Sequence, residues 1–349
     1  MPSATEPTST RQARRRGSSA GRYALIAALV AVLCASPLVI TASYYRYASV
    51  LVVMYMMMST SWNLVGGFTG YVSLGHSAFF GLGAYSTGLI ADESRTSVVL
   101  ALVATFPIAA AVGAIAGIAA LRVRGASFVI VTIALVYMGG LLAQGLRSVT
   151  GGSRGLDVAP LFDLDSRAAT HAAYTVLFAL LCGVVLTLWA LIDGSKFGLG
   201  LKAVREDEDK AESLGVSTTP FKLVAFVLSA AFVGLAGGLY ATWIGFIDPI
   251  FVFSVSISAN LVLMSLLGGA RSLWGPVLGA ALIVPMGEYF LINLPEMHLI
   301  STGLLLAGVV LLMPNGIIPS VQSLLEHRRP PAASIREEQP DRSPVEVLT

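Results

Sequence analysis

The sequence contains little charge. Only 12% of its 349 residues are charged, whereas about a quarter are in a typical soluble protein, and 55% are hydrophobic. The mean hydropathy is +0.78, and stretches of about twenty residues carry no charge at all. A soluble fold needs charged side chains over its whole surface, so this composition excludes a soluble enzyme and a disordered scaffold. The net charge of +2 also gives no basis for binding nucleic acid.

Three kinds of chemical site are missing as well. The pattern G-x-x-x-x-G-K-[ST] is absent, so the chain has no P-loop with which to hydrolyse ATP. There is no cluster with metal-ligand spacing and no catalytic cluster, which argues against an intramembrane enzyme. The two cysteines, Cys34 and Cys182, lie in apolar runs and are interpreted as small buried hydrophobes. The sequence therefore predicts no catalytic residue, no metal site and no cofactor bound by this chain.

What the sequence has in abundance is long apolar runs. A bilayer core of about 30 Å requires about 20 apolar residues for each helical crossing, and lipid admits only helices or closed barrels. The sequence lacks the alternating pattern of a barrel, so the prediction is an all-α, polytopic membrane protein with about ten helices. The predicted spans are Tyr23–Ile40, Tyr47–Val65, Ser73–Ala91, Ser97–Leu121, Ala126–Leu146, His171–Ile192, Leu223–Ile247, Ile250–Ala270, Gly275–Leu291 and Leu299–Ile318.

The basic residues predict the orientation of these spans. With ten helices and a cytoplasmic N-terminus, 17 of the 22 Lys and Arg residues fall on the inner side. Both termini are then cytoplasmic. Residues 1–22 and 321–349 are rich in Ser, Pro, Arg and Glu, which is typical of disordered tails, and they flank a membrane domain at 23–320. Five helices in each half would also permit an inverted 5+5 repeat, as in many transporters.

Ionisable side chains are absent from the middle of every predicted span. Proton-coupled and sodium-coupled carriers usually place such residues there. Glu288 comes nearest but lies close to the outer end of the ninth span, and His171 lies at a helix start. Any uphill transport would therefore need energy from a partner.

The most polar long cytoplasmic segment is 193–222. Its centre, residues 200–215, predicts one short helix with two i,i+4 ion pairs, Arg205 with Asp209 and Glu206 with Lys210. Gly215 is a natural C-terminal stop for this helix. Leu201, Val204 and Leu214 form an apolar edge. Two interpretations remain open: a solvated loop on the lipid headgroups, or a lever that docks into a soluble partner.

Glycine is concentrated in two segments. Residues 66–85 contain six glycines, and residues 267–280 contain four in a predicted cytoplasmic turn between spans eight and nine. Glycines allow helices to pack closely in membranes, but they also permit broken helices that line a cavity. The sequence does not decide whether 66–85 is a packed helix or a re-entrant segment. Candidate residues for a translocation path are Ser73, Gly75, His76, Ser77 and Phe79.

Four motifs together resemble the membrane subunit of the branched-chain amino acid family of ABC importers. They are G-Y-x-S-L-G-H-x-x-F-F-G-x-G-A-Y at 70–85, T-G-G-S at 150–153, A-V-R-E-D-E at 203–208 followed by S-L-G at 213–215, and L-G-G with S-L-W-G-P at 267–276. Their order and approximate spacing hold over residues 47–318. The match is specific because four separate motifs coincide.

The resemblance implies partners and site residues. Two separate cytoplasmic ATP-binding subunits would hydrolyse the ATP, and a coupling helix in this chain would sit in a cleft of the ATPase. The residues carried over to that helix are Ala203, Val204, Arg205, Glu206, Asp207, Glu208, Ser213, Leu214 and Gly215. A second permease, identical or related, would complete the pore, and an extracytoplasmic solute-binding protein would deliver the solute. The implied location is the prokaryotic cell membrane.

The predicted function is thus a permease subunit, not an enzyme, for branched-chain amino acids or related small polar solutes. Relatives in the same family carry urea or short amides, so these solutes stay open as alternatives. An ATP-independent channel or secondary carrier is a different class, which would be favoured if His76 and Glu288 formed a conduction path.

Overall fold

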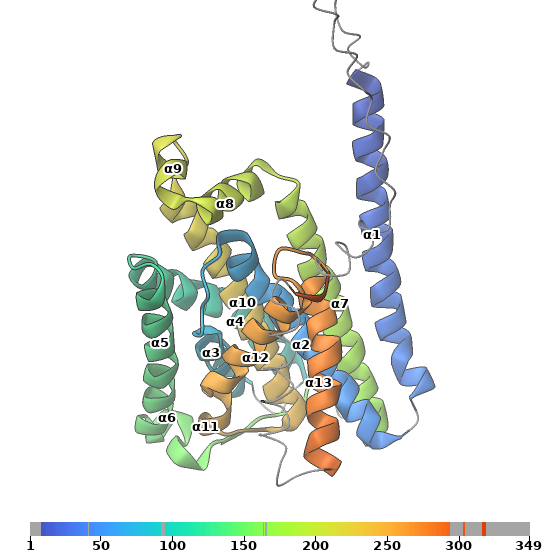
Figure 1. Cartoon of the computed structure of the whole chain (residues 1–349). Coiled ribbons are helices and arrows are strands. Elements are labelled where there is room, and N and C mark those ends of the chain that lie inside the picture. The colour runs from blue at the N-terminus through green and yellow to red at the C-terminus, as the bar shows by residue number, and fades with distance from the viewer. Residues whose placement is uncertain are drawn as a thin grey trace, which may run out of the picture.

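A computed structural model of the chain describes residues 8–40, 42–91, 95–162, 164, 166–293, 303 and 316–318. Helix dominates this part of the chain, as the apolar runs predicted (Figure 1). The long helices are α1 (Thr8–Val39), α2 (Ser43–Thr69), α3 (His76–Ile90), α4 (Arg95–Ala120), α5 (Ala126–Gly145), α7 (Arg167–Asp193), α10 (Thr218–Ile244), α12 (Val255–Gly268) and α13 (Gly275–Asn293). The short elements are α6 (Arg147–Thr150), the 3-10 turn η1 (Gly152–Arg154), α8 (Lys196–Glu206), α9 (Glu208–Ser213), α11 (Pro249–Val252) and the strands β1 (Leu156–Asp157) and β2 (Phe246–Ile247).

Seven helical segments of the described chain are long and apolar enough to cross a membrane. They are Ala20–Val39, Ser43–Thr69, Ser97–Ala120, Ala126–Gly145, Arg167–Asp193, Thr218–Ile244 and Pro249–Gly268. The count of ten is therefore not confirmed. The third predicted span contains a helix of only 15 residues, α3, and the ninth corresponds to the shorter apolar helix Gly275–Phe290. Most of the tenth lies outside the described residues.

Of the two predicted disordered tails, only the N-terminal one falls partly within the described residues. Helix α1 begins at Thr8 and so extends into the segment 1–22, whereas 321–349 lies outside the described residues. In Figure 1, α1 stands at the edge of the helix bundle. Only 11% of the apolar part of α1 is buried, against 78% of that of α2, so most of α1 is exposed on the outside of the bundle.

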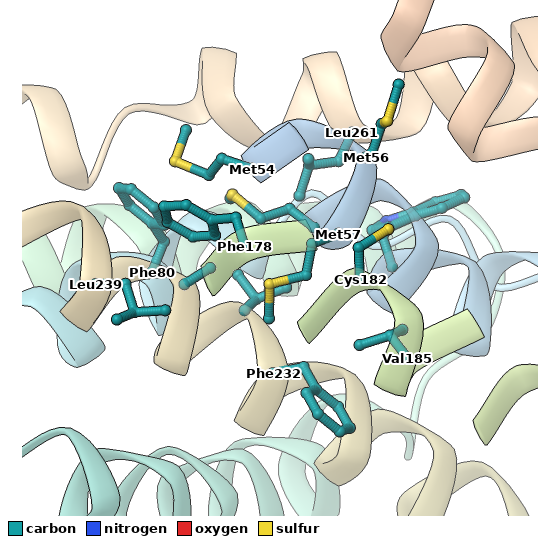
Figure 2. Packing of buried hydrophobic residues seen from close by; sticks show 14 of the residues in the cluster. Met54, Met56, Met57, Phe80, Phe178, Cys182, Val185, Phe232, Leu239 and Leu261 are labelled. Carbon is teal, nitrogen blue, oxygen red and sulfur yellow. The ribbon is translucent and has the colours of Figure 1, made fainter. Parts of the chain in front are cut away.

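The core lies between α2, α3, α7, α10 and α12. Figure 2 shows the methionine side chains of α2 among aromatic and aliphatic side chains of the neighbouring helices. Met57 is fully buried there, and so are Phe178 and Cys182 of α7. Cys182 thus packs as a small hydrophobe, as its apolar context predicted, whereas Cys34 is only half-buried. Unbranched methionine adapts to irregular gaps, which suits a helix surrounded on every side.

The loops gather at the two ends of the bundle. Helices α8 and α9 lie at one end together with the N-terminal end of α1, and Arg22 forms a 2.9 Å ion pair with Asp193 at the end of α7 (Figure 1). At the other end β1 pairs antiparallel with β2, with Leu156 opposite Ile247. The charged segment 193–222 and the start of the first span therefore share one side, as the distribution of basic residues predicted.

The glycine-rich segment 66–85 is a broken helix. Helix α2 ends where Gly70 adopts φ +75°, residues 70–75 are not helical, and α3 begins at His76. Buried partners satisfy this irregular backbone: Trp62 Nε1 donates to the Ser73 carbonyl (2.8 Å), and the Leu74 amide donates to Thr132 Oγ1 (3.1 Å). Non-helical backbone within a membrane domain requires such partners, since lipid offers none.

Candidate functional site

The segment predicted to act as a cytoplasmic lever, residues 200–215, consists of two helices, not one. The prediction of a single helix over 200–215 is wrong, because the helix is interrupted at Asp207, between α8 and α9. Asp207 has extended backbone, and its carboxylate accepts a hydrogen bond from the Lys210 amide at 3.0 Å. Aspartate is among the best N-cap residues, and this local bond competes with continuing the helix.

The two predicted i,i+4 ion pairs do not form, because they require an unbroken helix. Arg205 instead contacts Glu206 at 3.2 Å and donates to the carbonyl of Gly67, near the end of α2, at 2.8 Å. Lys210 pairs with Asp207 at 2.9 Å. Arg205 therefore links α8 to the membrane-spanning helix α2 through a hydrogen bond.

The predicted apolar edge divides between the two helices. Leu201 and Val204 are buried, whereas Leu214 is 85% exposed. Gly215 follows the end of α9, as predicted for a helix stop. Its φ is +86°, and the amide of Val216 donates a hydrogen bond to the Ala211 carbonyl. Leu214 thus stands exposed at the end of α9, in the same loop as the exposed acidic residues Glu206, Asp209 and Glu212.

Behind the lever lies a group of residues that we call the Glu208 cluster: Tyr71, Arg124, Glu208 and Lys222. Tyr71 Oη donates to Glu208 Oε2 at 2.6 Å, and Lys222 Nζ donates to Glu208 Oε1 at 2.5 Å. Lys222 Nζ also lies 3.2 Å from Tyr71 Oη and 4.8 Å from the centre of the tyrosine ring. Arg124 closes the cluster, 3.4 Å from Glu208 and 2.7 Å from Asp209.

The cluster shifts the ionisation of its members. Burial alone would raise the pKa of Glu208, but hydrogen bonds from Lys222 and Tyr71, with the charges of Lys222 and Arg124, hold that pKa below its usual 4.5. Burial, and then the bond to ionised Glu208, raises the pKa of Tyr71. Glu208 is therefore a carboxylate and Tyr71 a neutral hydrogen-bond donor at neutral pH.

Acid is expected to weaken this end of the molecule through Glu208. Its pKa is lower in the folded protein than in the unfolded chain, so its stabilising contribution is complete above pH 4.5 and is lost as the pH falls through the folded pKa. Arg124 and Tyr71 stay protonated over that range, because the pKa of each is raised above a value already far from acid pH. The thermal unfolding midpoint in detergent should therefore fall more for the wild type than for Glu208→Gln between about pH 6 and about pH 3.5. An equal fall in both would show that Glu208 is not the titrating group.

The candidate path residues lie within the helix break and at the start of α3, and the structure brings most of them together. Ser73, His76 and Ser77 are fully buried. His76 Nε2 lies 2.7 Å from Ser229 Oγ on α10, and Ser229 donates onward to the Ser61 carbonyl on α2 at 2.7 Å. The other ring nitrogen of His76 lies 3.2 Å from Ser73 Oγ. In this conformation these side chains join three helices.

Two further contacts and a cavity complete the surroundings of the candidate path residues. The Ser77 amide donates to Ser258 on α12 at 2.8 Å. A Cβ added at Gly75 would lie 2.9 Å from the Thr132 carbonyl on α5, so Gly75 permits close packing. Phe79 differs from the others, because its ring also lines a cavity. The role of the five residues in translocation stays a prediction.

Replacing Ser229 with alanine is expected to lower stability by about 1–3 kcal/mol, because His76 and the Ser61 carbonyl would both lose a buried partner. Thermal unfolding in detergent measures the effect. Ser213→Ala is the control, since that exposed hydroxyl bonds only to a carbonyl of its own helix. A Ser229 variant as stable as the Ser213 variant would contradict the role of this network.

Beside α3 lies a cavity of about 530 Å³ between α3, α4 and α5. Its walls are almost entirely apolar and include Phe79, Leu135, Met138 and Phe253, while Ser86 and Thr150 supply hydroxyl groups. Thr150 belongs to the predicted T-G-G-S motif. The volume falls within the range usual for small-molecule sites.

The predicted small-residue turn at 267–280 packs as expected. A Cβ added at Gly268 would lie 1.7 Å from the Gly275 carbonyl, and one at Gly279 would lie 1.8 Å from the Met264 carbonyl. Only glycine permits these approaches between α12 and α13.

The alternative conduction path is not supported by the contacts of its two residues. His76 bonds to Ser73 and Ser229, whereas Glu288 accepts a hydrogen bond from Tyr44 at 2.7 Å, at the opposite end of the bundle from α8 and α9. The two residues share no partner among these bonds.

Comparison with known proteins places this architecture in a family. The profile of the branched-chain amino acid transport system permease component matches residues 44–313, most of the chain. The chain belongs to this family. This membership makes it a membrane subunit of an ABC importer, a multi-pass protein of the cell membrane and not an enzyme.

Individual relatives agree with the profile. The high-affinity branched-chain amino acid transport system permease protein LivM of Salmonella typhimurium is 29% identical over 335 residues, covering 89% of this chain and 78% of that protein. LivM of Escherichia coli is 28% identical over 334 residues, with the same coverage. The probable branched-chain amino acid transport permease protein LivH of Methanocaldococcus jannaschii is 25% identical over 197 residues, covering 51% of this chain and 60% of that protein. No solved structure gives a significant match.

The Glu208 cluster is what reasoning from the sequence missed. Glu208 was assigned to the coupling helix, but Tyr71, Arg124 and Lys222 were not assigned to any site. One signal was available: Lys222 directly precedes the apolar run Leu223–Ile247, and an ionisable side chain at the start of a span requires a partner. Nothing in the sequence names that partner, because Tyr71 lies 151 positions away.

Proposed function

We propose that this chain forms half of the translocation path for branched-chain amino acids, and that two cytoplasmic ATP-binding subunits drive it through α8 and α9. Family membership supports the solute class, since the LivM and LivH relatives carry branched-chain amino acid transport in their names. The observation that carries the mechanism is the exposed acidic tip of α8 and α9, which Arg205 and the Glu208 cluster attach to the membrane helices.

The acidic tip specifies the chemistry of its partner. Glu206 and Asp209 are 67% and 81% exposed at the side chain, and Leu214 at the end of α9 is 85% exposed. A complementary ATPase surface would offer an apolar pocket with a basic rim. Buried apolar anchors usually dominate the energy of such interfaces, and rim charges set orientation.

The cavity beside α3 argues for a second permease. Its apolar wall suits a branched aliphatic side chain, but it is open at the surface of the single chain. In the bilayer an uncovered apolar cavity would meet lipid tails, and a zwitterionic solute pays a large desolvation cost in lipid. We infer that a second permease, identical or related, covers this face. An extracytoplasmic solute-binding protein would deliver the solute to the opposite end from α8 and α9.

The finer topology belongs to the same proposal. Ten spans with both termini cytoplasmic agree with the basic residues, of which 17 of 22 lie on the inner side. The 2.9 Å pair between Arg22 and Asp193 supports a shared side for the N-terminus and the lever. An inverted 5+5 repeat accords with that count.

The test is transport by the whole assembly. The chain is reconstituted in liposomes with the ATP-binding subunits, the second permease and the solute-binding protein that the proposal requires. We expect uptake of radiolabelled L-leucine that depends on ATP, and none by this chain alone. Uptake of urea or acetamide in place of leucine would assign the alternative solutes. Leucine accumulation that ignores ATP would overturn the importer and favour a channel or secondary carrier.

A further inference from the structure

The Glu208 cluster joins the lever to the two membrane segments that meet at His76. Glu208 is the first residue of α9, whereas Lys222 lies in the first turns of α10 and Tyr71 in the non-helical segment before α3. One carboxylate therefore holds both segments, with a separate oxygen for Tyr71 and for Lys222.

This ion pair is more buried than the other ion pairs among the described residues. The side chains of Lys222 and Glu208 are 3% and 10% exposed, whereas those of Lys210 and Asp207, in the same loop, are 83% and 37% exposed. Desolvation consumes much of the attraction within a buried pair, so an apolar pair of similar volume is often equally stable. Stability alone therefore does not explain why charges occupy this place.

Both segments lead from the cluster to the same point. Tyr71 is five positions before His76, and its ring packs edge-on against Phe128 at 5.0 Å. On α10, Phe226 lies one turn beyond Lys222. The centre of its ring is 5.6 Å from that of the Phe79 ring and 6.0 Å from that of the His76 ring. Ser229, farther along α10, forms the 2.7 Å contact with His76 Nε2.

These contacts form a continuous chain of packed groups. A displacement of α9 would shift Tyr71 and Lys222 together, because the same carboxylate holds both. The shift would then reach the start of α3, where Phe79 lines the cavity.

We propose that Glu208 is a positioning residue that transmits movement of α8 and α9 to the start of α3 through Tyr71 and Lys222. This inference rests on the proposed function, in which an ATPase moves the lever. It assigns Glu208 a role inside the permease, distinct from the exposed acidic residues that face the ATPase.

The test separates transmission from stability and from docking. In the double variant Glu208→Leu with Lys222→Met, apolar side chains replace the buried pair, so no charge is left unpaired. The control is Asp207→Asn with Lys210→Met, which removes the exposed ion pair of the same helix and keeps an N-cap residue. Each is assembled with the ATP-binding subunits, and three quantities are measured: co-purification, ATP hydrolysis and L-leucine moved per ATP.

We expect the buried-pair variant to assemble and hydrolyse ATP like the wild type, while leucine moved per ATP falls about tenfold, a typical coupling between sites. The control should keep the wild-type ratio. A normal ratio in the buried-pair variant would overturn the proposal, and so would an equal loss in the control.

Two further outcomes are decisive. If the double variant does not assemble, Tyr71→Phe decides, because it removes only the hydroxyl that bonds to Glu208 and Lys222. An assembled Tyr71→Phe protein with the wild-type ratio would overturn the proposal, and a lowered ratio would support it. Failure of the proposed function would be seen differently: the wild type itself would neither bind the ATP-binding subunits nor couple leucine uptake to ATP.

Discussion

Replacing Gly83 with alanine should sharply destabilise the protein. A Cβ at this position would lie 1.8 Å from the carbonyl oxygen of Gly234, so α3 and α10 could not keep their present separation. The fit is reciprocal, since a Cβ at Gly237 would lie 1.9 Å from the Phe80 carbonyl. Overpacking of this kind usually costs about 1–3 kcal/mol and occasionally more. Leucine at Gly83 should leave no correctly folded protein.

The measurement is the thermal unfolding midpoint in detergent, and leucine uptake should fall with it. The matched control is Gly145→Ala, because Gly145 is also helical and a Cβ there would meet nothing within 4 Å. Alanine has the higher helix propensity, so the control should keep or gain stability. Equal midpoints for Gly83→Ala and the wild type would mean that α3 and α10 do not pack as described.

Replacing Leu214 with aspartate is expected to abolish ATP-driven uptake while leaving insertion and folding intact. The side chain is 85% exposed and touches little of the permease, so its loss costs the subunit almost no packing. In the proposed assembly it enters an apolar pocket of the ATPase, and a charge there would remain unpaired. Truncation of such anchors commonly costs 2 kcal/mol or more, about thirtyfold in affinity.

Co-purification with the ATP-binding subunits measures this loss directly. Leu199→Asp serves as the control: Leu199 is also exposed, at 64%, but lies on α8, away from the acidic tip. The control should retain most ATPase binding. If both variants bind normally, the tip of α9 is not the docking surface. If both fail equally, the contact extends over the whole loop.

Glu206 and Asp207 have different roles in the structure, so replacing both with lysine would not test docking alone. Glu206 is exposed, whereas Asp207 caps α9 through the Lys210 amide. A lysine at Asp207 would also disrupt the helix, so only the Glu206 change reports on docking.

Several features followed from the sequence because they depend on local composition. Apolar runs such as Ala126–Leu146 predicted spans, since burying backbone polar groups in lipid leaves few alternatives to a helix. The polar loop at 193–222 and the helix stop at Gly215 were also predicted from local composition, because charged residues avoid lipid and glycine tolerates the positive φ at a helix end. The break at Asp207 was missed because the ion-pair pattern and the capping preference compete, and spacing does not rank them.

By itself, the sequence determined that this is a helical membrane protein with a charged loop on the side rich in basic residues, because hydropathy and charge act on each segment separately. Only the tertiary structure decided that Lys222 would meet Glu208 and Tyr71, and that Gly83 would lie against Gly234. The physical reason is that desolvated charges and close helix contacts depend on which distant segments become neighbours. That depends on the packing of the whole bundle, not on any one stretch of residues.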